Sequence, residues 1–241
     1  MRLPTIEGII RRRILVNYRV DPQIIQNLLP APFSPKLHQG LAIAGICLIR
    51  LEHIRPKTLP GIVGISSENA AHRIAVVWEG DNGETREGVF IPRRDTNSQI
   101  NHLLGGRVFP GEHHRAEFKV DESLNRIALS MTSDDGAVAV EVDGKITDEL
   151  QKTSVFRSLS EASAFFEAGS LGYSITSDSK RLDGLRLETK EWRVEALRVD
   201  EVYSSYFADE SRFPKGSVEF DNALIMRNIA HEWHSASDLY I

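Results

Sequence analysis

Short runs of apolar and β-branched residues, separated by turn signals, dominate the pattern of this chain, and helical spacing is rare. Residues 41–51 are mostly apolar at consecutive positions, as expected for a strand that is buried on both faces. The pairs Asn82-Gly83 and Asp135-Gly136 each stand between two such runs, which predicts a hairpin at each place. The predicted strands cover residues 9–20, 41–51, 73–79, 87–91, 126–131, 138–142, 185–194 and 217–226.

Three segments carry helix signals. Asp21 can cap a helix that has Pro22 in its first turn, and apolar residues at helical spacing continue this helix to Leu29. A second predicted helix starts at Asp95 or Thr96, passes through 99–104 and ends at Gly105-Gly106. A third covers residues 160–168.

These helices stand between hairpins and do not alternate with strands, which disfavours a parallel doubly wound sheet. The pattern predicts a β-rich α+β fold, in which a closed or strongly curved mixed sheet forms a β-barrel or cone with a few peripheral helices. No linker or repeat marks a boundary, so we expect a single domain over residues 1–241. The pattern leaves open whether the second half of the chain completes the cone or caps it.

Composition excludes several classes of protein. The net charge is −5, from 34 acidic and 29 basic residues without a long block of one sign, so nucleic acid is not an expected partner. Cys47 is the single cysteine, which excludes an intrachain disulfide, and its apolar surroundings suggest a buried, inert thiol. The chain has no apolar run long enough to span a membrane and no signal peptide, so a cytoplasmic location is expected.

Standard chemical motifs are absent from the sequence. The chain has no glycine-rich phosphate or dinucleotide loop, no nucleophile-elbow serine and no Cys-x-x-Cys pair. His231 and His234 are three residues apart, whereas the metalloprotease helix needs a spacing of four. A packed Trp233 between two hydrogen-bonded histidines is the preferred interpretation, so neither a metal nor a cofactor is expected.

Several short motifs occur in an order that resembles the acetoacetate decarboxylase-like superfamily, and within it a family of domains of unknown function, DUF2071. The resemblance covers about residues 9–145 and depends on the order of the motifs more than on any one of them. They are the basic strand 11–22, Leu28-Leu29-Pro30, Ile65-Ser66-Ser67-Glu68, Gly88-Val89-Phe90 and Gly105-Gly106-Arg107-Val108-Phe109-Pro110.

The resemblance implies a β-cone around a central cavity, with a lysine that forms an imine with a keto acid and a second lysine that lowers the pKa of the first. Here the positions after Phe109-Pro110 are Gly111 and Glu112, which provide no amine. Imine chemistry is therefore expected to be absent unless Lys119 replaces the missing nucleophile, and a solvated surface lysine is the more usual role for such a residue. A homo-oligomer is compatible with this resemblance, because decarboxylase relatives assemble into larger complexes.

Two further residues match family positions that line the decarboxylase cavity. Glu68 matches a cavity glutamate, which with a raised pKa can act as an acid or base, and Arg11 matches an arginine that holds the substrate carboxylate. The alternative is that Arg11 lies in a solvated basic strand and that Glu68 forms a structural ion pair with Arg11 or Arg73.

The histidines add candidate acid/base groups. His113 and His114 point to opposite faces of a strand, so at most one of them enters a cavity, and we favour His113 or Arg115 there. His72 stands four residues after Glu68 and shares its strand face if no bulge intervenes. The candidate catalytic residues are Glu68, His72 and His113, and the candidate ligand-binding residues are Arg11, Glu112 and Arg115. Arg93 and Arg94 could also place charge at a cavity mouth, although arginines at a strand end are commonly exposed.

Two functional hypotheses follow from these residues. The first is a small-molecule-binding β-cone whose cavity takes a carboxylate, carbonyl or apolar metabolite. The second is an enzyme that uses Glu68 with His72 or His113 for general acid/base chemistry on a carbonyl or hydroxy-acid compound, without an imine.

Overall fold

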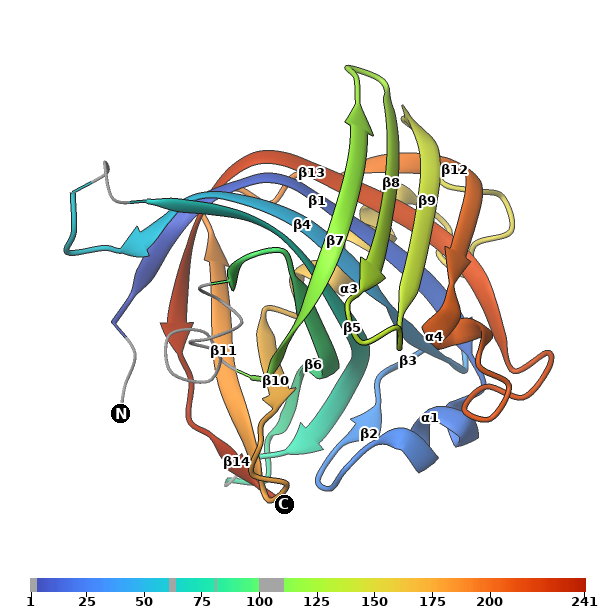
Figure 1. Cartoon of the computed structure of the whole chain (residues 1–241). Coiled ribbons are helices and arrows are strands. Elements are labelled where there is room, and N and C mark those ends of the chain that lie inside the picture. The colour runs from blue at the N-terminus through green and yellow to red at the C-terminus, as the bar shows by residue number, and fades with distance from the viewer. Residues whose placement is uncertain (1–3, 61–63, 81, 100–110) are drawn as a thin grey trace.

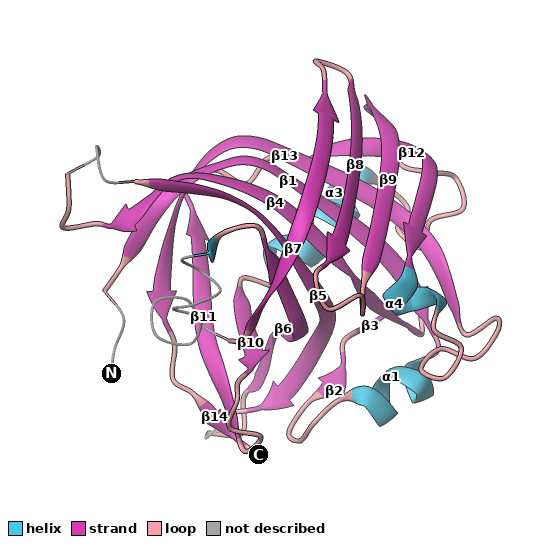
Figure 2. Ribbon diagram, viewed as in Figure 1, coloured by secondary structure: helices cyan, strands magenta, loops and turns pink. Residues whose placement is uncertain are grey.

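A computed structural model describes residues 4–60, 64–80, 82–99 and 111–241. One continuous, strongly curved mixed sheet dominates it, and the short helices lie at its periphery (Figures 1 and 2). The long strands are β1 (Ile6–Val20), β4 (Leu41–Pro56), β5 (Ile65–Glu79), β6 (Thr85–Thr96), β7 (His113–Glu122), β8 (Arg126–Ser133), β9 (Ala139–Thr147), β10 (Leu171–Ile175), β11 (Arg181–Thr189), β12 (Glu195–Ser204) and β13 (Val218–Ser235). The short elements are β2 (Ser34–Pro35), β3 (Leu37–His38), β14 (Leu239–Tyr240), α1 (Pro22–Leu28), α3 (Leu159–Glu167) and α4 (Ser205–Ala208).

Local chemistry fixes the elements that the sequence predicts. The Asp21 side chain accepts a hydrogen bond from the Gln23 backbone N–H at 2.8 Å and so caps α1 at its start. The Ser158 side chain caps α3 in the same way, by accepting from the Glu161 N–H at 3.1 Å. Both predicted hairpins, β5–β6 and β8–β9, are present in antiparallel register. The β-rich fold with a curved mixed sheet and few peripheral helices is therefore confirmed.

Two strands each divide one edge between two neighbours, and this division closes the sheet into two rings. On β6, residues 89–91 pair with β10 and residues 94–96 pair with β7, in both cases in parallel. On β13, residues 223–225 pair with β12 and residues 231–235 pair with β11. The smaller ring consists of β1, β4, β5, β6, β10, β11 and β13, and the larger ring of β1, β4, β5, β6, β7, β8, β9, β12 and β13.

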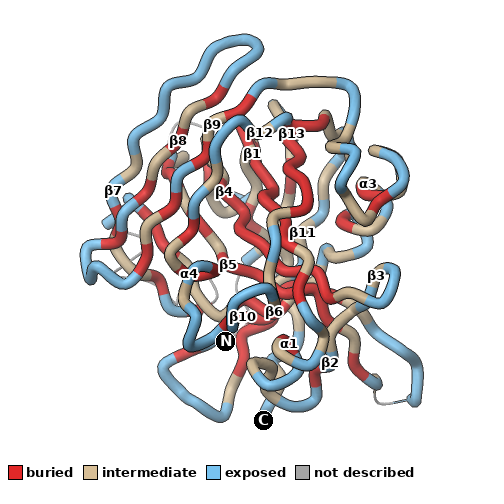
Figure 3. Tube along the Cα trace, turned by 90° about the vertical axis from the view of Figure 1, so that its right-hand side faces the viewer, coloured by how far each residue is buried: buried red, intermediate tan, exposed pale blue. Residues whose placement is uncertain are grey.

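Five strands, β13, β1, β4, β5 and β6, belong to both rings, so both of their faces point to an interior, and Figure 3 shows that buried positions follow these central strands. The main apolar core includes Ile14, Val16 and Ile46 on one face and contacts β8 and β9 across the larger ring. The opposite face carries Leu15 and Cys47, against which α3 packs. Strands from the second half of the chain, β10 to β13, thus complete the cone.

The sequence pattern misplaced several strands in the second half of the chain: β10 was not predicted, and β13 continues past the predicted end at residue 226. The strand predicted over 185–194 is β11, which begins at Arg181 and ends at Thr189, because Asp183-Gly184 reads as a turn but lies within the strand. The strand β12 was not predicted, since charged residues alternate along its outer face. Most of the helix predicted through 99–104 lies outside the described residues.

A close approach between β1 and β4 makes Gly45 a sensitive position. A Cβ atom at this position would lie 2.2 Å from the Val16 carbonyl oxygen, which belongs to the neighbouring backbone. We predict that Gly45→Ala lowers the free energy of unfolding by about 3 kcal/mol, as measured by urea denaturation. Gly169→Ala is the control, because its Cβ would meet its nearest atom at an ordinary 3.4 Å. Equal stability of the two variants would contradict this interpretation.

Candidate functional site

A cavity of about 120 Å³ lies within the smaller ring. Most of its wall is apolar and comes from strands on opposite sides of the ring, including Ile49 on β4, Val89 on β6 and Leu185 on β11. The polar side chains are fewer and come mainly from the shared strands. They are Arg13, Cys47, Asn69, Arg73, Arg94, Asp95, His113 and Ser170.

Strand alternation and register explain why these polar groups meet. Cys47 pairs with Ala71 on β5, and Ala71 pairs with Arg94 on β6, so the three positions share one face of the sheet. Arg94 in turn pairs with His113 on β7. The cavity therefore lies where β6 changes its partner from β10 to β7.

The three cavity arginines form hydrogen bonds with neutral groups. Arg13 Nε donates to Cys47 Sγ at 3.2 Å, and Arg94 Nε donates to Ser174 Oγ at 2.9 Å. Arg73 Nη2 donates to the Asn17 side-chain oxygen. Two further donors, Arg13 Nη1 and Arg73 Nε, are buried and have no hydrogen-bond partner among the described residues.

The acidic residues near the cavity already have other partners. Asp95 contributes to the wall but accepts hydrogen bonds from Arg93 at 2.8 and 3.0 Å. Asp183 accepts from the Gly111 N–H at 3.0 Å and lies 3.4 Å from Arg181. Within the described residues, Arg13, Arg73 and Arg94 make no ion pair with a carboxylate.

Burial lowers the pKa of both Arg73 and Arg94 to about 10. The Cys47 sulfur opposes this lowering in both cases, and the neighbouring charge of Arg13 adds to it for Arg73. Both guanidinium groups therefore remain charged at neutral pH. A buried cation without an anionic partner is unfavourable, and binding of an anion would relieve that cost.

The opposite face of the shared sheet holds a buried ion-pair cluster. Glu68 accepts a hydrogen bond from Arg12 Nη2 at 2.6 Å, and Arg12 Nη1 donates to Glu122 at 3.0 Å. Burial raises the pKa of Glu68, and the charges of Arg12 and Arg50 oppose that shift. The alternative of a structural ion pair for Glu68 is thus what the contacts favour, with Arg12 as the partner instead of Arg11 or Arg73.

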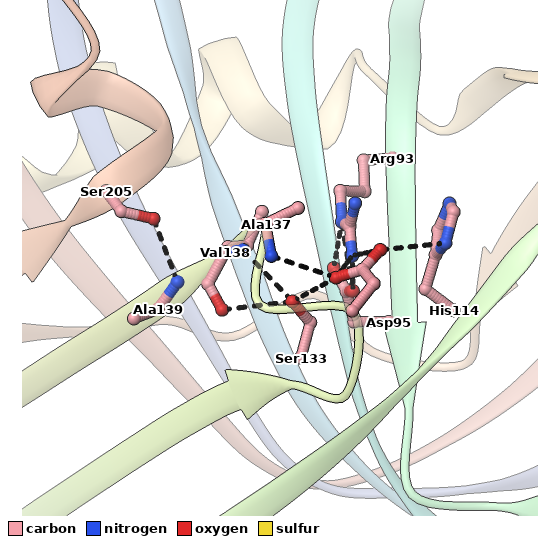
Figure 4. Close-up of polar contacts among 9 residues, drawn as sticks. Arg93, Asp95, His114, Ser133, Ala137, Val138, Ala139 and Ser205 are labelled. Atoms are coloured by element: carbon pink, nitrogen blue, oxygen red, sulfur yellow. Dashed lines mark hydrogen bonds and ion pairs between the residues drawn. The ribbon is translucent and has the colours of Figure 1, made fainter.

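A second polar cluster attaches the β8–β9 turn to β6 (Figure 4). Arg93 bridges the buried carboxylate of Asp95 and the exposed carboxylate of Asp135, the latter at 2.9 Å. The Ser133 hydroxyl donates to Asp135 at 2.6 Å, and this contact together with Arg93 holds the pKa of Asp135 well below its usual range. Arg93 is therefore a structural group, whereas its neighbour Arg94 lines the cavity.

The structure separates the candidate catalytic residues. His113 lines the cavity and its Nδ1 lies 3.2 Å from the Gly111 carbonyl oxygen. Glu68 and His72 are on the other face of β5, away from the cavity-lining Arg73. Their side chains share a face, as expected, but Glu68 bonds to Arg12 whereas His72 packs against the ring of Tyr206 with centroids 4.5 Å apart.

The candidate ligand-binding residues lie at the surface of the ring. Arg11 is exposed and bonds to Asn228, because a register shift between Ile10 and Arg12 displaces it from the regular alternation. Glu112 is exposed, and Arg115 donates to the Asn97 carbonyl oxygen at 3.0 Å. Among described residues, these three do not line the cavity.

Most of the polar residues that line the cavity were not among the candidates that the sequence suggested. Arg13 is the last of three consecutive arginines and Arg73 follows His72, so neither position stands out from its neighbours in the sequence. Arg94 had been considered for a cavity mouth, and Cys47 had been read as an inert thiol. Lys119 is an exposed residue on β7 that lies 3.7 Å from Glu117 and does not line the cavity.

The position of Gly111 explains why a lysine is not accommodated there. Gly111 has a φ of 82°, and a Cβ atom would lie 2.5 Å from Ser174 Cβ on β10. Any side chain would therefore strain the backbone and displace β10.

The described residues contain no group of three His, Cys, Asp or Glu side chains arranged to hold a metal ion. His231 is buried and packs against Trp233 with ring centroids 4.7 Å apart, while His234 lies 3.4 Å from Glu188 and Glu232. Because the two histidines are three residues apart on β13, they point to opposite faces of the sheet. No helix in the described part of the chain is long and apolar enough to cross a membrane.

Comparison with known families identifies the chain. The profile of a family described as an uncharacterized conserved protein, DUF2071, matches residues 10–221. The chain belongs to the DUF2071 family. No curated protein sequence matches it.

Solved structures share the fold of this DUF2071 protein. An acetoacetate decarboxylase-like enzyme from Sphingomonas wittichii superimposes with a TM-score of 0.58 at 13% identity, covering 98% of this chain and 92% of the other. Acetoacetate decarboxylase from Legionella pneumophila gives 0.58 at 11% identity, with coverage of 98% and 88%. The enduracididine biosynthesis enzyme MppR in complex with pyruvate gives 0.57 at 11% identity, with coverage of 98% and 89%. At these identities the likeness establishes the acetoacetate decarboxylase-like fold alone.

The buried imidazoles predict how stability depends on pH. Burial, followed by the charges of Arg93 and Arg212, lowers the pKa of His72 from 6.5 to about 3, and burial lowers that of His231 to about 4. The unfolded chain therefore takes up protons below pH 6.5 that the folded protein does not, and stability falls as the pH decreases toward these values.

We predict that His72→Leu reduces this loss between pH 6.5 and 4, where His72 contributes at most about 1.4 kcal/mol per pH unit. Urea denaturation at several pH values measures the slope of the unfolding free energy for the two proteins. His231 remains in the variant, so part of the slope should persist. Identical slopes would show that His72 is not protonated more readily in the unfolded chain.

Proposed function

We propose that this protein binds a small carboxylate in the cavity of the smaller ring. The observation that carries the proposal is that Arg13, Arg73 and Arg94 line one cavity without an ion-pair partner among the described residues. Charged side chains are rarely buried unless they are paired, so this arrangement favours an anionic ligand that supplies the missing charge.

The unused donors suggest how the ligand would be held. Arg73 Nε and Arg13 Nη1 can donate charge-assisted hydrogen bonds to carboxylate oxygens, which are about twice as strong as neutral ones. The apolar wall formed by residues such as Val89 and Leu185 would contact the remainder of the ligand. This division between a few polar groups and an apolar wall is typical of small-molecule sites.

The size of the cavity restricts the ligand further. Its volume of about 120 Å³ is slightly below the roughly 150 Å³ of an engineered cavity that binds benzene. A ligand with about six non-hydrogen atoms therefore suits it, which includes three-carbon keto and hydroxy acids. The fold likeness to MppR, whose structure was determined in complex with pyruvate, makes pyruvate the first compound to test.

A lysine imine is not part of the proposal. Among described residues no lysine lines the cavity, and Gly111 leaves no room for a side chain beside Ser174. Binding would rest on the arginines alone.

The binding proposal is tested by titrating pyruvate and its uncharged methyl ester into wild type and Arg73→Met by calorimetry. Pyruvate should bind wild type, and the variant should lose about 10- to 100-fold in affinity, because hydrogen bonds to charged groups contribute about 1.5–3 kcal/mol. The methyl ester should bind weakly to both proteins. Without ligand, the variant should be at least as stable as wild type, since it lacks a buried unpaired cation.

Arg126→Met is the matched control for net charge. Arg126 is a surface residue on β8 that forms an ion pair with Asp143, and it does not line the cavity. This variant should keep wild-type affinity. Equal binding of the ester and the acid, or equal affinity in all three proteins, would contradict an arginine-held carboxylate.

An enzyme with non-covalent acid/base chemistry is the second candidate, and the position of His113 in the cavity wall favours it. An imidazole beside a bound keto acid could exchange the protons next to its carbonyl group. We predict that wild type exchanges the methyl protons of pyruvate for deuterium in heavy water faster than His113→Gln, as followed by proton NMR. If the two proteins bind pyruvate equally well and exchange its protons at the same rate, the result would contradict an acid/base role for His113 and support a binding role only.

A further inference from the structure

Cys47, on β4, is the single cysteine of the chain, and carboxylate binding alone makes no use of it. The side chain lies in the cavity wall and is 7% exposed. Its sulfur accepts a hydrogen bond from Arg13 Nε at 3.2 Å. The Arg13 guanidinium is therefore in direct contact with the sulfur, where it can stabilise negative charge that develops during attack on a ligand.

A second observation connects this sulfur with the ligand site. Arg73 is 4% exposed and lines the same cavity, and its Nε has no hydrogen-bond partner in the described part of the chain. Cys47 and Arg94 belong to the same cavity wall. A carboxylate bound to Arg73 would share this cavity of about 120 Å³ with the sulfur.

We propose that Cys47 is the nucleophile of this cavity and adds reversibly to the carbonyl carbon of a small keto acid held by Arg13 and Arg73. The inference rests on the proposed carboxylate site. In the addition, the sulfur–carbon bond forms, the π bond of the carbonyl group breaks, and the thiol proton passes to the carbonyl oxygen. The product is a hemithioketal, and no oxidant, reductant or leaving group is involved.

Arg13 has a further part in this step. Its Nε contacts the sulfur, and its Nη1 has no hydrogen-bond partner among the described residues. The same guanidinium can therefore stabilise the sulfur before the addition and donate to the oxygen that gains electron density during it.

Alkylation with iodoacetate and iodoacetamide tests whether this thiol is nucleophilic within an anion site. The two reagents differ in charge, and the single cysteine makes the labelled position unambiguous, with Cys47→Ser as the blank. In urea, where the chain is unfolded, the rates give the intrinsic preference between the reagents. In the folded protein, the ratio of the iodoacetate rate to the iodoacetamide rate should rise at least about tenfold, which corresponds to about 1.4 kcal/mol of charge recognition.

Pyruvate should slow the labelling of folded protein, and Arg73→Met should reduce the rate with iodoacetate much more than the rate with iodoacetamide. Pyruvate labelled with carbon-13 at its carbonyl carbon tests the addition itself. Its carbon NMR signal should move to the range of a saturated carbon on wild type, whereas Cys47→Ser should bind pyruvate without this change.

The outcomes separate this inference from the carboxylate site. If calorimetry shows pyruvate binding but the folded ratio equals the unfolded one, or the carbonyl signal stays in place, Cys47 is not the nucleophile and the binding site stands. If pyruvate does not bind and the ratio of the two labelling rates is the same in the folded and the unfolded protein, both proposals are wrong.

Discussion

The division of one edge of β6 and one edge of β13 between two neighbours is the constraint on which the rest of this structure depends. Each of these strands continues past the end of its first partner and pairs with a second, so a single sheet closes twice. At the partner change on β6, between Ile91 and Arg94, β10 ends and β7 begins beside the same strand. The cavity lies there, and Arg94 spans the change by bonding to Ser174 on β10.

Double closure also gives the shared strands two interiors with different chemistry. On the face toward the larger ring, the buried charges of Arg12 and Glu68 neutralise each other at 2.6 Å. On the face toward the smaller ring, the arginines have only neutral partners among the described residues. Removing one member of the first cluster would leave a buried charge, whereas removing one arginine of the second would relieve repulsion. The first arrangement suits stability, and the second suits recognition of an anion at some cost in stability.

The limits of sequence reasoning follow from the same topology. Hairpin turns and helix caps are local, so the β5–β6 and β8–β9 hairpins and the cap at Asp21 could be predicted. The face of a strand that meets a cavity is not local when both faces are interior. Glu68 and Arg73 are both buried on β5, and alternation alone cannot tell which one meets the ligand. Strand β1 presents the same difficulty. The resemblance implies that Arg11 faces the cavity, but the register shift between Ile10 and Arg12 places Arg11 at the surface.

A cavity rich in guanidinium groups has different consequences for an amine and for a thiol. A lysine must lose its proton to attack a carbonyl carbon, and neighbouring cations lower its pKa to make this easier. A cysteine must also lose a proton, but its reactive form is an anion, which the same cations stabilise directly. Gly111 and Ser174 leave no space for a lysine. The positive charge of the arginines can then favour only a nucleophile or ligand that carries negative charge. The proposed carboxylate satisfies this condition, and the proposed nucleophile, Cys47, lines the same cavity.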